Sequence, residues 1–76
     1  MNIQVKLYGD LRRHAPGDEP QFTLRLQPGA ILEDIQRMLA VADAPHIALI
    51  NGRRSTKEAA VADGDTLVLM PLISGG

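Results

Sequence analysis

The sequence contains no cysteine, and it has no excess of charge of either sign. Without cysteine the chain cannot form a disulfide, a thiolate zinc site or a cysteine nucleophile, and this composition fits a reducing compartment. Eight Lys and Arg residues oppose nine Asp and Glu residues, which gives a net charge of −1. Because that balance provides no overall field to attract nucleic acid or an anionic membrane, we expect neither as a partner.

Long hydrophobic runs are also missing. The longest, residues 67–73, falls far short of the roughly 20 residues that a membrane-spanning helix needs. The chain starts with polar and apolar residues in alternation, which differs from the continuous apolar segment of a secretory signal. We therefore expect a cytoplasmic protein.

The 76 residues are enough for one small domain. Leu, Ile, Val and Phe make up 21 of them, which is above the roughly 20% floor of disordered chains, so the chain should fold. A domain of this size buries only about 60% of its unfolded surface. Little interior remains for a deep catalytic pocket, and we do not expect an autonomous enzyme.

Two segments near the start alternate with the period of a half-buried strand, residues 2–8 and residues 21–27. We expect the second strand to run antiparallel to the first. The stretch between them is rich in turn residues and reads as a long ordered loop with one helical turn over 11–15.

The period then changes to that of a helix. One apolar stripe recurs at helical spacing over residues 30–42, formed by Ile31, Leu32, Ile35, Met38, Leu39 and Ala42. No polar capping residue precedes it, so Gly29 or Ala30 should act as a weak N-cap. We expect the segment ending in Pro45 to terminate this helix, because proline lacks an amide hydrogen.

The second half of the chain predicts further strands. They are expected over 46–50, over 53–55 after an Asn51-Gly52 hairpin turn, and over 66–70, with a capped helical turn over 56–61. The last strand is apolar on both faces and should lie centrally, covered by the helix on one side and partly by loops on the other. Pro71 should end it. The predicted fold is α+β, with a mixed four- to five-stranded sheet packed on one main helix.

The sequence ends in Ser74-Gly75-Gly76, which we expect to project as a flexible tail over 74–76 from a folded domain over 1–73. Two residues without Cβ make a slim peptide that can enter another protein's active site. Attack of its carboxylate on the α-phosphate of ATP would give an acyl-adenylate, open to a sulfur or amine nucleophile. The alternative is a frayed end without a role.

The chain resembles the β-grasp, ubiquitin-like sulfur carriers, namely the small subunit of molybdopterin synthase and the thiamine sulfur carrier. The likeness covers essentially the whole chain. It rests on the element order and on five pieces of sequence: residues 5–9 followed by 11–13, residues 28–30 before the helix, the turn 51–52, residues 63–67, and the passage from Pro71 to Gly75-Gly76.

That resemblance implies a carrier rather than an enzyme. An adenylating, ubiquitin-activating-type partner would activate Gly76, and sulfur transfer would convert it to a thiocarboxylate, with Gly75 giving the tail clearance. ATP and the sulfur donor would be used through that partner, with no cofactor bound by the chain itself. Contacts with the activating enzyme and with a larger synthase subunit would fall on Pro71, Leu72, Ile73 and Ser74. Alternatively, the apolar residues among these close the core.

The loop over 9–20 and the spacing from Pro71 to the tail are most similar to the molybdopterin type, which implies a role in molybdenum cofactor biosynthesis. Leu72 stands where that type has a second proline, and Met70 where an aromatic residue is common. Three alternatives stay open: a carrier for thiamine thiazole or another sulfur pathway, a ubiquitin-like modifier joined through Gly76 to a lysine, and an interaction module with an inert tail.

Other candidate groups predict little chemistry. His14 and His46 have no third ligand at a recognisable spacing, so we expect no metal site. Asp63-Gly64-Asp65 reads as a turn, since the rest of a calcium-binding loop is missing. The pairs Arg12-Arg13 and Arg53-Arg54 are solvated or dock on an acidic partner, depending on where they lie. No phosphate-binding glycine motif occurs.

Overall fold

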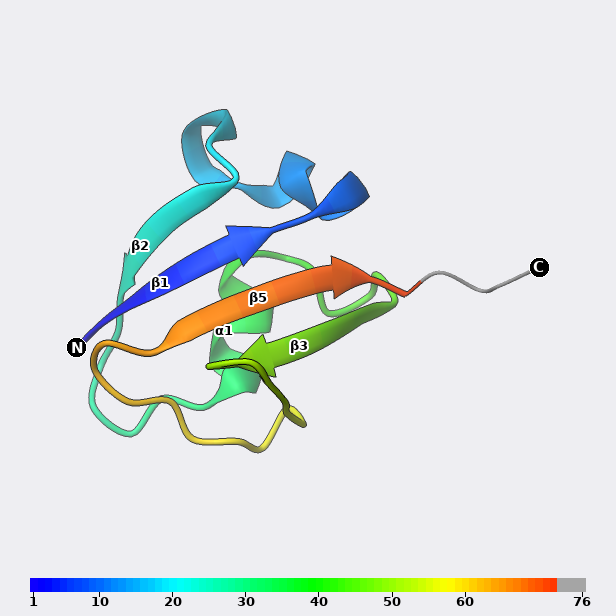
Figure 1. Ribbon diagram of the computed structural model, residues 1–76. Coiled ribbons are helices and arrows are strands. Elements are labelled where there is room, and N and C mark those ends of the chain that lie inside the picture. Colours follow the sequence, from blue (N-terminus) through cyan, green and yellow to red (C-terminus); the bar gives the residue numbers. More distant parts are fainter. Residues whose placement is uncertain (73–76) are drawn as a thin grey trace.

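The structure, a computed structural model, describes residues 1–72. Its elements, in chain order, are β1 (Asn2–Leu7), the 3-10 helices η1 (Gly9–His14) and η2 (Pro16–Asp18), β2 (Gln21–Arg25), α1 (Leu32–Met38), β3 (His46–Ile50), β4 (Arg53–Arg54) and β5 (Thr66–Pro71). The strands form one mixed sheet in the order β2-β1-β5-β3-β4, with α1 packed across one face (Figure 1). The predicted α+β architecture of one sheet on one main helix is confirmed.

Strand β5 occupies the centre of the sheet, as its uninterrupted apolar sequence predicts. It pairs in parallel with β1, where Leu7 lies opposite Leu69, and antiparallel with β3, where Ala48 lies opposite the same residue. Leu67 and Leu69 are fully buried beneath α1. The core they share contains Ile3, Val5, Leu7, Leu11, Ala15, Leu26, Leu32, Ile35, Leu39, Val41, Ala48 and Val61.

The expected partial loop cover over the second face of β5 was wrong. Val68 is half-buried and Met70 is 40% exposed on that face. The loop over 57–59 lies on the helix side instead: Leu32 and Glu33 donate their amide hydrogens to the carbonyls of Ala59 and Lys57 at 2.9 Å. One face of the sheet is therefore open across its centre.

Helix α1 is shorter than the predicted 30–42, and its N-cap is Ile31 rather than Gly29 or Ala30. The Asp34 carboxylate accepts a hydrogen bond from the Ile31 amide at 2.8 Å, and carbonyls of the loop over 57–59 accept the next two amides. These tertiary partners satisfy donors that a polar N-cap would otherwise take. The same loop forms a turn and a bridge to Ile31, not the helical turn predicted over 56–61.

The helix ends well before Pro45, which corrects the predicted terminator. Ala40 adopts a left-handed conformation, with φ of 57°, and its amide donates to the Arg37 carbonyl at 3.1 Å. The Val41 amide reaches back to the Gln36 carbonyl at 3.0 Å, completing a Schellman motif. Ala42 lies beyond this turn and is exposed, and Met38, the last residue of α1, is 56% exposed, so neither belongs to the buried apolar stripe.

The hairpin turn is confirmed and carries a network that the sequence did not reveal. Asn51 and Gly52 both have positive φ, at 51° and 81°. The Asn51 side chain donates to the Asp65 carboxylate at 2.8 Å and accepts from the Thr66 amide at 2.9 Å. The predicted turn at residues 63–65 thus ties the hairpin to the start of β5.

Among residues 1–72, no helix has the length and apolar character to cross a membrane.

Replacement of Ala40 by glycine should stabilise the fold by about 1 kcal/mol, because a left-handed conformation strains an L-residue and suits glycine. Urea unfolding measures the change. Ala42→Gly is the matched control: Ala42 is exposed and has no positive φ, so that substitution should be neutral or destabilising. Equal effects of the two substitutions would contradict the assignment of strain to Ala40.

Candidate functional site at the end of strand β5

The last described residues show where the chain leaves the sheet. Pro71 still lies opposite His46 in the ladder, and the Leu72 amide donates to the Pro45 carbonyl at 3.2 Å. Leu72 is 54% exposed. Pro71 therefore ends β5, one residue later than the strand predicted over 66–70, and Leu72 does not close the core.

Four of the predicted site residues, Ile73, Ser74, Gly75 and Gly76, lie outside the described residues. The predicted tail over 74–76 and the domain boundary after residue 73 therefore stay predictions. The structure places Pro71 and Leu72, the two predicted contact residues that precede them.

Gly9 permits a close approach of Pro71 that the sequence did not predict. Its φ is +58°, and a Cβ built on it would lie 2.5 Å from Cγ of Pro71. Nearby, the Tyr8 amide donates to the Leu69 carbonyl at 3.1 Å. The end of β1 and the end of β5 are thus held together by a backbone hydrogen bond and by a contact that only glycine permits.

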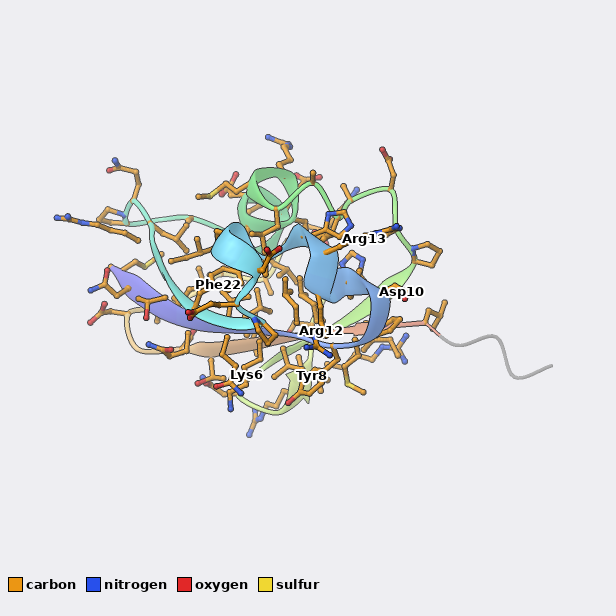
Figure 2. The ribbon with its side chains drawn as sticks, turned by 90° about the horizontal axis from the view of Figure 1, so that it is seen from above. Lys6, Tyr8, Asp10, Arg12, Arg13 and Phe22 are labelled. Carbon is orange, nitrogen blue, oxygen red and sulfur yellow. The ribbon has the colours of Figure 1, made fainter. Side chains whose placement is uncertain are left out.

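Apolar side chains gather on the uncovered face of the sheet, at its centre. The register places four of them on the adjacent strands β3 and β5, because residues opposite one another project to the same side, and the fifth directly follows β1. Tyr8 is 48% exposed, and Figure 2 shows it with Lys6 on the side of the sheet away from α1. We call this surface the open sheet face; its residues are Tyr8, Ile47, Leu49, Val68 and Met70.

The open sheet face could have been anticipated only in part. Ile47 and Leu49 alternate with Ala48, and this alternation along β3 predicts that they lie on the face away from the core. Alternation does not predict whether other residues cover that face. Exposure depends on where the loops pack, and the loops pack near α1. Contiguous apolar surface of this kind commonly marks a binding site.

The arginine pairs diverge in the structure. Arg13 lies with His14, Pro45 and Leu72 along a groove of about 230 Å³ beside the end of β5. Arg12 faces a separate hollow beneath Tyr8. On β4, Arg54 lies opposite Leu49 and so projects to the side of the open sheet face.

Neither histidine shows the geometry of a metal ligand. His14 Nδ1 lies 3.1 Å from the Leu39 carbonyl, whereas His46 contacts the Ala44 carbonyl through Nδ1 and the Gln36 amide through Nε2. Within residues 1–72, no three His, Asp or Glu side chains cluster as a metal site would require. The carboxylates of Asp63 and Asp65 accept backbone hydrogen bonds, which agrees with a turn.

No family model and no curated protein matches the sequence. Solved structures do match. SAMP1 from Haloferax volcanii, described as small archaeal modifier protein 1, aligns over 100% of both chains with a TM-score of 0.80 and 22% identity. Subunit 1 of molybdopterin-converting factor from Helicobacter pylori, in a structure of its complex with subunit 2, also aligns over 100% of both chains. Its TM-score is 0.66 and its sequence identity is 18%.

A third match extends the group to Urm1 from Trypanosoma brucei, with a TM-score of 0.70 and 16% identity over 99% of this chain and 95% of that one. All three alignments take in almost the entire chain, so the likeness concerns the complete fold. The chain has the ubiquitin-like β-grasp fold that these solved structures share.

A Gly9→Ala variant should lose more stability than a Gly17→Ala variant. Both glycines have positive φ, but a Cβ at Gly17 meets no atom within 4 Å. The difference in unfolding free energy therefore isolates the contact with Pro71, and we expect it to be about 1–3 kcal/mol. Urea denaturation of the two variants measures it. Equal losses would show that Pro71 does not constrain this position.

Proposed function

We propose that the chain is a non-catalytic sulfur carrier whose C-terminal glycine, Gly76, is adenylated by a partner enzyme and then converted to a thiocarboxylate. The observation that carries the proposal is the course of β5. This central strand leads past Pro71 to an exposed Leu72, and the sequence then ends in Ser74-Gly75-Gly76 within four residues. The β-grasp fold shared with solved carriers and modifiers supports it.

The chemistry requires a partner, because a carboxylate is a poor acyl donor until it is activated. Its oxygen attacks the α-phosphate of ATP, pyrophosphate leaves, and the glycyl carbonyl is held as an acyl-adenylate. A sulfur nucleophile then displaces AMP. The chain supplies the carboxylate and a slim diglycine approach, while ATP and the sulfur donor are used through the adenylating enzyme.

The sulfur-loaded chain would act as a subunit or cosubstrate of a larger synthase. We place contacts with both partners on the open sheet face together with Pro71, Leu72, Ile73 and Ser74. The exposed apolar surface at Tyr8, Met70 and Leu72 favours this assignment.

Molybdopterin synthesis is the acceptor pathway that we favour. The subunit 1 that this chain matches along its full length is described in complex with a subunit 2 of molybdopterin-converting factor. The loop over 9–20 agrees with the same type. Transfer to thiamine thiazole or to another acceptor would use the same loaded glycine.

A ubiquitin-like modifier is the second candidate, and the match to small archaeal modifier protein 1 favours it. In that role an amine, rather than sulfur, would attack the activated glycine. Extension into chains is disfavoured because the chain has only two lysines, Lys6 and Lys57, and Lys6 is half-buried. Attachment of a single copy to another protein is compatible with the fold.

Intact-mass measurement after incubation with ATP, the adenylating enzyme and a sulfur donor should show one oxygen replaced by sulfur, located at Gly76 by fragmentation. Deletion of Gly76 should abolish the mass shift, because it removes the reacting glycine, and should leave the circular dichroism spectrum unchanged. Normal loading of the truncated chain would refute the site. An adduct on another protein's lysine, without sulfur, would support the modifier instead.

Leu72→Asp should weaken binding of the adenylating enzyme by at least about tenfold, because the contact would bury a charge. Unfolding free energy should change by less than about 0.5 kcal/mol, since Leu72 is exposed. Met38→Asp is the matched control: Met38 is 56% exposed on α1, across the sheet from the open sheet face. Calorimetry measures the affinities.

Binding unaffected by Leu72→Asp, or weakened equally by Met38→Asp, would contradict the docking surface. Loss of folded signal in Leu72→Asp by circular dichroism would instead assign Leu72 to the core.

A further inference from the structure

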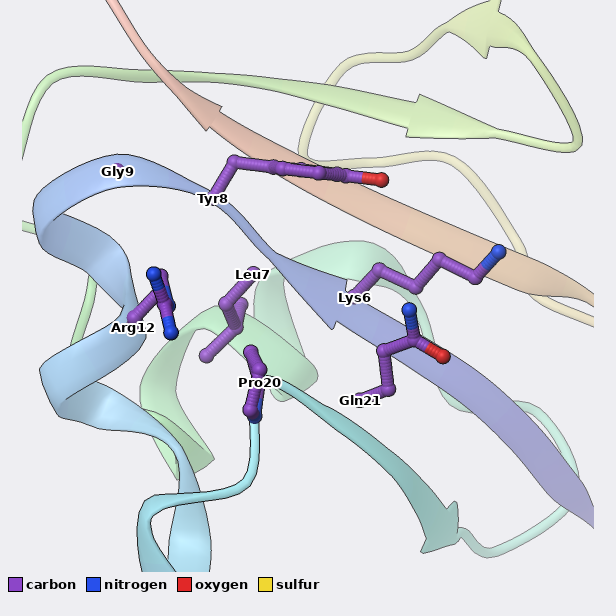
Figure 3. Close-up of a pocket in the computed structure, with 7 residues that line it drawn as sticks. All are labelled: Lys6, Leu7, Tyr8, Gly9, Arg12, Pro20 and Gln21. Carbon is purple, nitrogen blue, oxygen red and sulfur yellow. The ribbon is translucent and has the colours of Figure 1, made fainter.

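A hollow of about 200 Å³ lies at the rim of the open sheet face, between the end of β1 and η1. Arg12 and Lys6 flank it, the Tyr8 ring runs along one rim, and Pro20 and Gln21 line another (Figure 3). Its remaining lining comes from Leu7, which is buried, and from the backbone around Gly9. We call this hollow the Arg12 cleft.

The Arg12 cleft carries two positively charged side chains that form no ion pair within residues 1–72. The ion pairs within residues 1–72 join Glu33 to Arg37 at 3.3 Å and to Lys57 at 3.9 Å, both on the helix side. Neither Arg12 nor Lys6 is paired with a carboxylate there. Lys6 is half-buried, which agrees with an aliphatic stem that lies along the sheet and an ammonium that stays in contact with water.

The groups around the cleft match a carboxylate. A guanidinium presents planar donors that fit two carboxylate oxygens, an ammonium adds a point charge, and the Gln21 side-chain amide adds a neutral donor. The Tyr8 ring offers apolar contact to the methylene groups of an acidic side chain. Together these groups would recognise a glutamate or aspartate within an apolar segment.

The cleft is continuous with the open sheet face through Tyr8, which belongs to both. A free anion would gain nothing from the apolar neighbours of Tyr8, whereas a protein segment would bury them. We propose that the Arg12 cleft binds an acidic side chain of a partner protein, with apolar residues beside that side chain packing on the open sheet face. The proposal concerns recognition and does not depend on the sulfur chemistry of Gly76.

The test uses a blocked tripeptide with glutamate between two leucines, and a second tripeptide with glutamine in its place. Titration of the isotope-labelled full chain, followed by NMR, should shift the Arg12 Nε–H and Gln21 side-chain amide signals. The glutamate peptide should bind about tenfold more tightly than the glutamine peptide, as a charge-assisted hydrogen bond predicts. Arg12→Gln should remove most of that difference, and Lys6→Gln a smaller part.

Arg25→Gln is the matched control. Arg25 is an exposed residue of β2 and lies opposite Asn2 of β1. Its replacement by glutamine changes the net charge by the same amount as Arg12→Gln. Its affinity for the glutamate peptide should stay within about twofold of the parent chain, because surface charge away from a contact contributes little.

Three results would overturn the proposal: no shifts at the Arg12 cleft, equal binding of the two peptides, or equal loss of affinity in Arg12→Gln and Arg25→Gln. Inorganic phosphate provides a further arm. Displacement of the glutamate peptide by phosphate at equal concentration would indicate a small-anion site and would also reject docking of a protein segment. We expect conversion of Gly76 to the thiocarboxylate, measured separately by intact mass, to proceed whichever of these results is obtained.

Discussion

The central position of β5 is the constraint on which the rest of the structure depends. Flanked by β1 and β3, the strand has neighbours for its backbone on both sides, and its side chains divide between the two faces. Leu67 and Leu69 anchor the core beneath α1, whereas Val68 and Met70 point away from it. One strand thereby supplies the stability of the domain, the middle of the open sheet face and the path to the C-terminus.

This division separates folding from recognition. The loop over 57–59 accepts the first amides of α1 on the core side, and a separate network joins Asn51 to Asp65 at the start of β5. The open sheet face contributes little to that network, so a partner can cover it without unfolding anything. The Arg12 cleft borders this surface, and Leu72 follows the end of β5, where Pro71 approaches Gly9 closely. The carrier that we propose would use such a surface to present its last glycine to successive partners.

Much of the fold was predictable because the relevant signals are local. Alternation located the long strands, and the Asn51-Gly52 turn has the positive φ angles its residues favour. The boundaries of the helix could not be predicted from local signals. Carbonyls distant in sequence accept hydrogen bonds from its first amides, and Ala40 at its end has a left-handed conformation that glycine usually adopts. Of the site, Pro71 and Leu72 were foreseen. Tyr8 was missed, and docking of Arg12 on an acidic partner was left open, since both depend on how η1 and the loops pack.

The central claim is that the open sheet face and the end of β5 form one docking surface for the adenylating enzyme. Methyl-labelled NMR of the chain in complex with that enzyme tests it most directly. The methyl signals of Ile47, Leu49, Val68 and Leu72 should shift or broaden, while those of Leu24 and Ile31 on the helix side stay unchanged. Perturbation confined to Leu24 and Ile31 would contradict the account.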